Sequence, residues 1–173
     1  MALTTEELDF AVTAMLCDSA VAAEGKLYLQ GAGWDMINPP TGTYPTRVPR
    51  VGLGMLIAVP YTATNRNHTM RIGLKGADGE GIALGLQPAD PADPTSAGTL
   101  PMYYVEASFN VGRPPQLQGG ESQTIPFAMN LDGLGINQPG NYNFVIEIDQ
   151  REVQRLTFRA MPVQQGQIVM GPR

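Results

Sequence analysis

Apolar and polar residues alternate over much of the chain, a pattern that indicates strands with one buried face. The clearest alternating runs cover residues 51–59, 70–74, 103–111, 125–131 and 142–148, and another at 156–160 follows a short turn. Turn-forming residues separate these runs, and no stretch keeps the spacing of a helix. We therefore predict an all-β protein, a two-layer antiparallel β-sandwich of Ig-like or C2-like type with eight to nine strands.

Local signals refine this prediction. Asp78-Gly79 predicts a tight hairpin, and Pro126, which cannot donate a ladder hydrogen bond, places its strand at a sheet edge. Tyr142 follows a glycine-containing corner, so it is either a tyrosine corner, with its hydroxyl bonded to the preceding loop, or an ordinary core or rim tyrosine. The alternation puts Tyr103 on the inward face. We expect two loops, a connection at 38–49 and a proline-rich crossover between the sheets at 87–101.

One domain accounts for this length. We expect a lead-in at residues 1–7, a β-sandwich over 8–162 and a tail at 163–173. The tail is mostly polar but carries three consecutive apolar residues, Ile168, Val169 and Met170, which a free tail would normally avoid. Two interpretations stay open: the triplet packs on its own sandwich, or it adds to a sheet edge of a neighbouring subunit.

Composition and charge narrow the range of partners that we expect this chain to bind. The chain has 43% apolar but only 16% charged residues, with 20 glycines, 15 prolines and a net charge of −5. Without a basic stripe, nucleic acid and anionic membranes are not expected partners. No run of about 18 apolar residues occurs, and the start does not resemble a signal peptide, so we expect a cytoplasmic protein. Cys17 stands alone in an apolar run and is interpreted as a small buried hydrophobe.

Candidate catalytic groups are few. His68 is the one histidine in the chain; it lies beside a turn and is interpreted as a surface residue, and no Gly-x-Ser-x-Gly elbow accompanies it. Glu106 and Glu147 project from polar strand faces, as solvated carboxylates do. No spaced Asp/Asn pattern of a calcium loop and no dinucleotide-binding loop is present. We therefore expect no cofactor, no metal and no enzymatic activity.

Trp34 has two interpretations. It follows a glycine pair and either fills the core where the glycines leave room or anchors an interface. Our leading hypothesis is a non-catalytic structural or protein-interaction subunit of a bacterial assembly, either self-associating or bound to a protein partner. A carbohydrate- or small-ligand-binding domain, or a cryptic hydrolase, that uses Trp34, Tyr103 or Tyr104 is the alternative. A phage or particle shell component would share the features of the leading hypothesis.

Two segments resemble a family of uncharacterised bacterial β-sandwich proteins. Residues 16–37 contain an Asp-x-Ala, a Gly-Lys and a Gly-x-Gly-Trp pattern, where family members are similar but have adjacent glycines; Ala32 intervenes here. Residues 140–144, Gly-Asn-Tyr-Asn-Phe, with the hairpin that follows, resemble the family's ending. The resemblance implies a compact β fold and transfers no functional residues, because the family carries no established activity.

Overall fold

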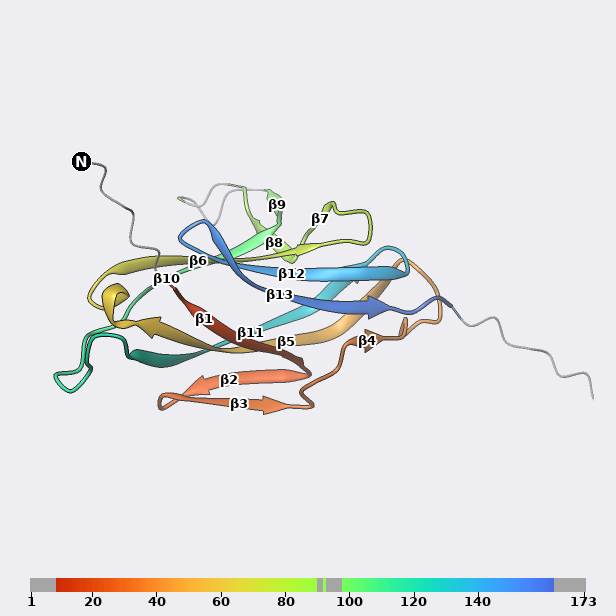
Figure 1. The fold of residues 1–173 in the computed structure, drawn as a ribbon. Coiled ribbons are helices and arrows are strands. Elements are labelled where there is room, and N and C mark those ends of the chain that lie inside the picture. The colour runs from red at the N-terminus through yellow and green to blue at the C-terminus, as the bar shows by residue number, and fades with distance from the viewer. Residues whose placement is uncertain (1–8, 90–91, 93–97, 164–173) are drawn as a thin grey trace, which may run out of the picture.

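The protein is built almost entirely of strands arranged in two facing sheets (Figure 1). The computed structural model describes residues 9–89, 92 and 98–163. One sheet has the order β1–β5–β11, formed by Ala11–Cys17, Thr46–Pro60 and Ser122–Ile136. The other has the order β10–β6–β12–β13–β4, formed by Tyr104–Asn110, Asn67–Lys75, Gly140–Ile148, Arg151–Ala160 and Met36–Ile37. All these neighbours are antiparallel except β13 and β4, which are parallel.

Short strands surround these two sheets. β7 (Gly81–Ile82) pairs with β6, while β2 (Ser19–Ala23) with β3 (Lys26–Gln30), and β8 (Gly85–Pro88) with β9 (Thr99–Met102), form two-stranded ribbons. A 3-10 turn at Tyr61–Ala63 is the one helical element of the described chain, in which no helix is long and apolar enough to cross a membrane. These additions bring the described strands to thirteen, so the all-β prediction is confirmed but the expected eight to nine strands were too few.

The strand order is immunoglobulin-like. Among the described residues, the first, second and fifth long strands (β1, β5, β11) share one sheet, and the third, sixth and seventh (β6, β12, β13) share the other. The fourth, β10, lies beside the third rather than beside the fifth. Tyr142, at the start of the sixth long strand, donates its hydroxyl hydrogen to the carbonyl O of Gln138 at 2.8 Å. The predicted tyrosine corner is therefore confirmed, in the position typical of this fold.

The core lies between the two sheets and follows the predicted alternation. Phe158 is stacked on Tyr142, with ring centroids 5.4 Å apart, and contacts Phe144 at 5.9 Å. Burying such side chains is the main favourable term in folding. The largest fully buried residues come from both sheets: Leu53, Met55, Ile57, Leu134 and Ile136 from one, and Met70, Ile72, Leu74, Tyr142, Phe144, Ile146 and Phe158 from the other.

β5 and β11 are longer than the sequence pattern predicted, because in both strands the alternation of inward and outward side chains shifts by one residue at the same point. Gly133 has φ +69° and lies between two paired positions, Asp132 with Arg50 and Leu134 with Val48. The residue between Arg50 and Val48 is Pro49, which has no N–H to donate. Leu131 and Leu134 both face the core, three residues apart instead of two. Residues 46–49 therefore belong to β5, and the connection expected over 38–49 ends earlier.

The proline-rich segment at 87–101 does not cross between the sheets. Gly85–Pro88 pairs with Thr99–Met102 as an antiparallel ribbon. The strands on either side of it, β6 and β10, are neighbours in the same sheet. The inward orientation expected for Tyr103 is also wrong: it is 50% exposed, because it lies between β9 and β10, before the pairing of β10 with β6 begins at Tyr104.

Candidate functional site

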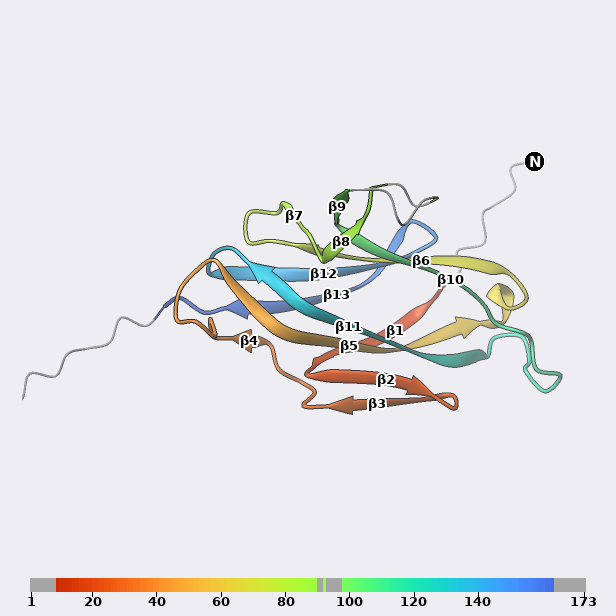
Figure 2. The same ribbon diagram turned by 180° about the vertical axis from the view of Figure 1, so that it is seen from behind.

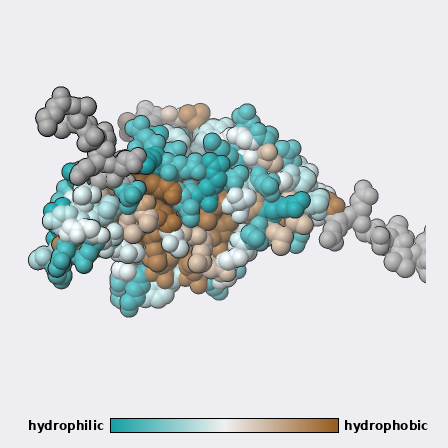
Figure 3. Space-filling view, viewed as in Figure 1, coloured by the Kyte–Doolittle hydropathy of each residue, from teal (hydrophilic) through white to brown (hydrophobic). Residues whose placement is uncertain are grey.

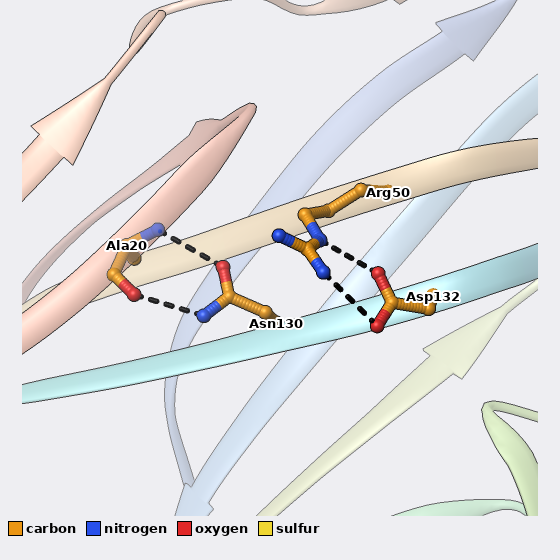
Figure 4. A network of polar contacts seen from close by, with 4 residues as sticks. All are labelled: Ala20, Arg50, Asn130 and Asp132. Carbon is orange, nitrogen blue, oxygen red and sulfur yellow. Dashed lines mark hydrogen bonds and ion pairs between the residues drawn. The ribbon is translucent and has the colours of Figure 1, made fainter.

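The β2–β3 hairpin forms a third layer on the outer face of the β1–β5–β11 sheet (Figure 1). Gly52 and Gly54 make room for it: a Cβ at Gly52 would lie 2.7 Å from the sulfur of Cys17, and one at Gly54 would overlap Leu29. Asn130 of β11 holds the layer in place. Its Oδ1 accepts the Ala20 N–H at 2.9 Å and its Nδ2 donates to the Ala20 carbonyl at 2.8 Å (Figure 4).

On this side of the molecule, both on the hairpin and on the sheet beside it, large apolar side chains are exposed to solvent. Met15 and Leu56, on the outer face of the sheet, are 46% and 39% exposed, and the cross-strand pair Val21 and Tyr28, on the solvent side of the hairpin, is 52% and 50% exposed. Figure 3 shows hydrophobic surface in the middle of its view, over β1 and β2. We call these four residues the apolar face.

The apolar face has no charged neighbour on the adjoining sheet surface. The side chains that share the outward direction there are uncharged: Ala11, Thr13 and Met15 of β1, Leu56 and Ala58 of β5, and Thr124, Pro126 and Ala128 of β11. Charged side chains occur at the other end of the sheet, where Arg50 Nε donates to Asp132 at 2.6 Å (Figure 4), and on the hairpin, where Lys26 shares the solvent face with Tyr28. An uncharged surface of this kind is a candidate interface.

A groove of about 590 Å³ lies at the charged end, between two strand edges. Among the described strands, β11 pairs only with β5, and β8 pairs only with β9. Figure 2 shows this side, with β11 nearest the viewer and β8 and β9 above it. The groove is lined on the β11 side by Arg47, Asp132, Gly133, Gly135 and Asn137, and on the other side by residues 81–86 and Tyr103. Its volume is that of a typical ligand site.

A second hollow, of about 210 Å³, lies on the outer face of the larger sheet and shares Gly81 and Tyr103 with the groove. Arg71 donates to Glu106 at 2.6 Å, and its guanidinium lies 4.7 Å from the centre of the Tyr104 ring. Hydrogen bonding to Glu106 raises the pKa of Arg71. These side chains are engaged with one another, so they form a salt-bridged strand surface more than an open site.

A family model matches most of the chain. The model of DUF6941, described as a family of unknown function, covers residues 12–161. The chain belongs to the DUF6941 family. No curated protein matches this DUF6941 chain. The resemblance seen in the sequence is thus confirmed as far as an uncharacterised family.

Solved structures share only a distant likeness with this DUF6941 chain. It is similar to an alkylpurine DNA glycosylase, AlkC, of Pseudomonas fluorescens bound to DNA containing an abasic site analogue, with 8% identity and a TM-score of 0.41 over 90% of this chain and 31% of that one. It is also similar to a β-D-glucoside glucohydrolase of Trichoderma reesei, with 8% identity and a TM-score of 0.36 over 93% of this chain and 20% of that one. The chain therefore spans less than a third of either relative.

His68 of the DUF6941 chain is not the surface residue that the sequence suggested, because it is only 3% exposed. Its Nε2 donates to the carbonyl O of Ala63, and its Nδ1 lies 2.7 Å from Asp149 Oδ2. Asp149 also accepts the N–H of Thr69 and lies in the β12–β13 turn with φ 51°. His68 therefore ties this turn to β6, a structural use of the ring.

Two other residues singled out in the sequence of the DUF6941 chain, Trp34 and Cys17, pack against the rest of the fold. Trp34 is partly buried, with its ring edge-on to Phe158 at 5.9 Å, and does not line the groove. Cys17 is fully buried, as predicted, and burial raises the pKa of its thiol. Ile168, Val169 and Met170 lie outside the described residues. Among the described residues, no group of three or more His, Cys, Asp or Glu side chains gathers as metal ligands would.

Proposed function

We propose that this DUF6941 chain is a non-catalytic structural subunit of a bacterial cytoplasmic assembly, and that it associates with a second copy of itself through the apolar face. The observation that carries the proposal is the exposure of Met15, Val21, Tyr28 and Leu56 on one side of the molecule. Soluble monomers rarely leave contiguous apolar patches of large side chains uncovered.

The distribution of charge favours a second copy of this chain as the partner that covers the apolar face. The chain carries a net charge of −5, so two copies repel one another, and repulsion is smallest where the meeting surfaces carry no charge. The outward residues of β1, β5 and β11 around Leu56 are uncharged. Most soluble homo-oligomers pair the same patch on both subunits.

The test is the mass in solution, measured by light scattering over a range of concentrations. We expect a dimer that Leu56→Asp weakens at least tenfold, because each copy would place a carboxylate in the interface. Val21→Asp, on the solvent side of the hairpin, provides a second variant that leaves the sheet untouched. Ser108→Asp adds the same charge to the outer face of the other sheet and should leave the dimer intact. Circular dichroism reports whether each variant folds.

A wild-type chain that stays monomeric at high concentration would refute self-association. A dimer that is insensitive to both Leu56→Asp and Val21→Asp, with the variants folded, would refute the apolar face as its interface.

A further inference from the structure

The groove beside Tyr103 has backbone, rather than side chains, on much of its surface. It lies between the edges of β11 and β8, which in the part of the chain that the structure describes pair only with β5 and β9 respectively. A strand edge presents unpaired N–H and C=O groups to anything that lies along it. An extended polypeptide is the ligand that can pair with such a row, by adding one strand to the sheet.

Glycines keep this backbone accessible. A Cβ placed on Gly135 would have nothing within 4 Å, and those on Gly81 and Gly85 would meet only single atoms at 3.5 Å. Gly54 is the opposite case, because the β2–β3 hairpin fills the space beside it. Glycine weakens a strand and often marks close approach of another backbone. The space that a side chain at Gly135 would take is therefore open to a ligand that lies in the groove.

The side chains of the groove define the chemistry of that ligand. Arg47 Nη1 would lie 3.6 Å from a Cβ on Gly133, which puts the guanidinium over the β11 side of the groove. Within the described ranges the side chain of Arg47 has no hydrogen-bond or ion-pair partner, whereas Asp132 is engaged by Arg50 through bonds of 2.6 and 3.3 Å. On the opposite wall Ile82 is partly buried and Leu86 is 69% exposed, whereas Leu84 belongs to the core.

We propose that this groove binds an extended peptide segment that carries a carboxylate. The peptide backbone pairs along the free edge of β11 at Gly133 and Gly135. One of its apolar side chains packs against Ile82 and Leu86, and its carboxylate accepts hydrogen bonds from the guanidinium of Arg47, a fork that suits a carboxylate. The site is separate from the apolar face, so this proposal does not depend on self-association.

The test uses seven-residue peptides in which valine and threonine alternate. One position holds glutamate or glutamine, and the C-terminus is an acid or an amide, so the four forms distinguish a side-chain carboxylate from a terminal one. Binding is followed by anisotropy of a labelled peptide and by amide NMR shifts of Gly133 and Gly135. We expect shifts at both glycines, and at least tenfold tighter binding for peptides with a carboxylate than for the glutamine amide.

Two variants and a control separate the contributions. Arg47→Gln should remove the preference for a carboxylate, and Gly135→Val, which has room for its side chain in the free protein, should weaken binding of every peptide form by placing a side chain in the groove that Gly135 lines. Arg159→Gln removes an exposed arginine from β13 and should change nothing. Absence of shifts at the two glycines with all four peptides, or binding that Arg47→Gln leaves unchanged, would overturn the proposal. Shifts produced by maltohexaose or cellohexaose but by no peptide would overturn it in favour of a carbohydrate site.

Discussion

The two hydrogen bonds between the Asn130 side chain and the Ala20 backbone lead to a specific prediction, because one side chain makes both of these bonds to the β2–β3 layer. Asn130→Ala removes both the 2.9 Å and the 2.8 Å hydrogen bonds and leaves the N–H and C=O of the buried Ala20 without partners. A net hydrogen bond contributes about 1 kcal/mol, and a buried polar group left unpaired costs about 1–3 kcal/mol. We therefore expect Asn130→Ala to lower the free energy of unfolding by about 2–4 kcal/mol. In a chain of this size that shifts Tm by about 4–16 °C.

Hydrogen exchange locates the effect. In the Asn130→Ala variant, amides of β2 and β3 should exchange through an opening that leaves the amides of β12 protected, because the hairpin can separate while the two sheets stay packed. Asn110→Ala is the matched control: it removes one exposed side-chain bond, to Asn67, and should change stability by less than about 0.5 kcal/mol. If Asn130→Ala changes stability by no more than this amount and the amides of the hairpin stay protected from hydrogen exchange, Asn130 does not hold the β2–β3 layer and the reasoning is wrong.

Three further predictions concern single groups. Tyr142→Phe removes the hydroxyl bond to Gln138 and should lower stability by about 1 kcal/mol in urea unfolding; an unchanged midpoint would show that the corner bond is energetically silent. The Cys17 thiol, buried and with a raised pKa, should react with a disulfide reagent no faster than the protein unfolds, and rapid labelling of native protein would contradict its burial. The hydrogen bond from Arg50 lowers the pKa of Asp132, so this pair stabilises the fold above the unfolded-state pKa of about 4 and ceases to do so as pH falls through the lower folded-state value. Arg50→Ala should return the Asp132 pKa toward its ordinary range in a carboxyl NMR titration, and an unmoved pKa would exclude this cause.

Two-residue alternation was sufficient to predict the sandwich core and several local features. The runs that contain Ile72, Phe144 and Phe158 supply both sheets with inward side chains, as expected. Pro126 lies on β11, the edge strand that its missing N–H predicted. The Asp78-Gly79 turn joins β6 to β7, with Gly79 at φ +85°. These features depend on residues close in sequence, whose conformational preferences are visible without the fold.

The sequence pattern failed where the strand itself changes phase or where a partner is remote. At Gly133 the alternation breaks, so the last residues of β11 could not be recognised as strand. His68 looked solvent-exposed because Asp149, its partner, lies 81 residues away in the chain. The groove is still harder to foresee, since it needs two strand edges, β8 and β11, to be brought together without pairing.

The contact between Ala20 and Asn130 spans 110 residues of chain, which orders the events of folding. β2 and β3 can form their ribbon early, because they are joined by a tight turn at Glu24 and Gly25. The ribbon cannot be fastened until β11 has been synthesised and has added to β5. Until then the two hydrogen bonds from Asn130 that hold this cover over Gly52 and Gly54 cannot form, so we expect the third layer to close last.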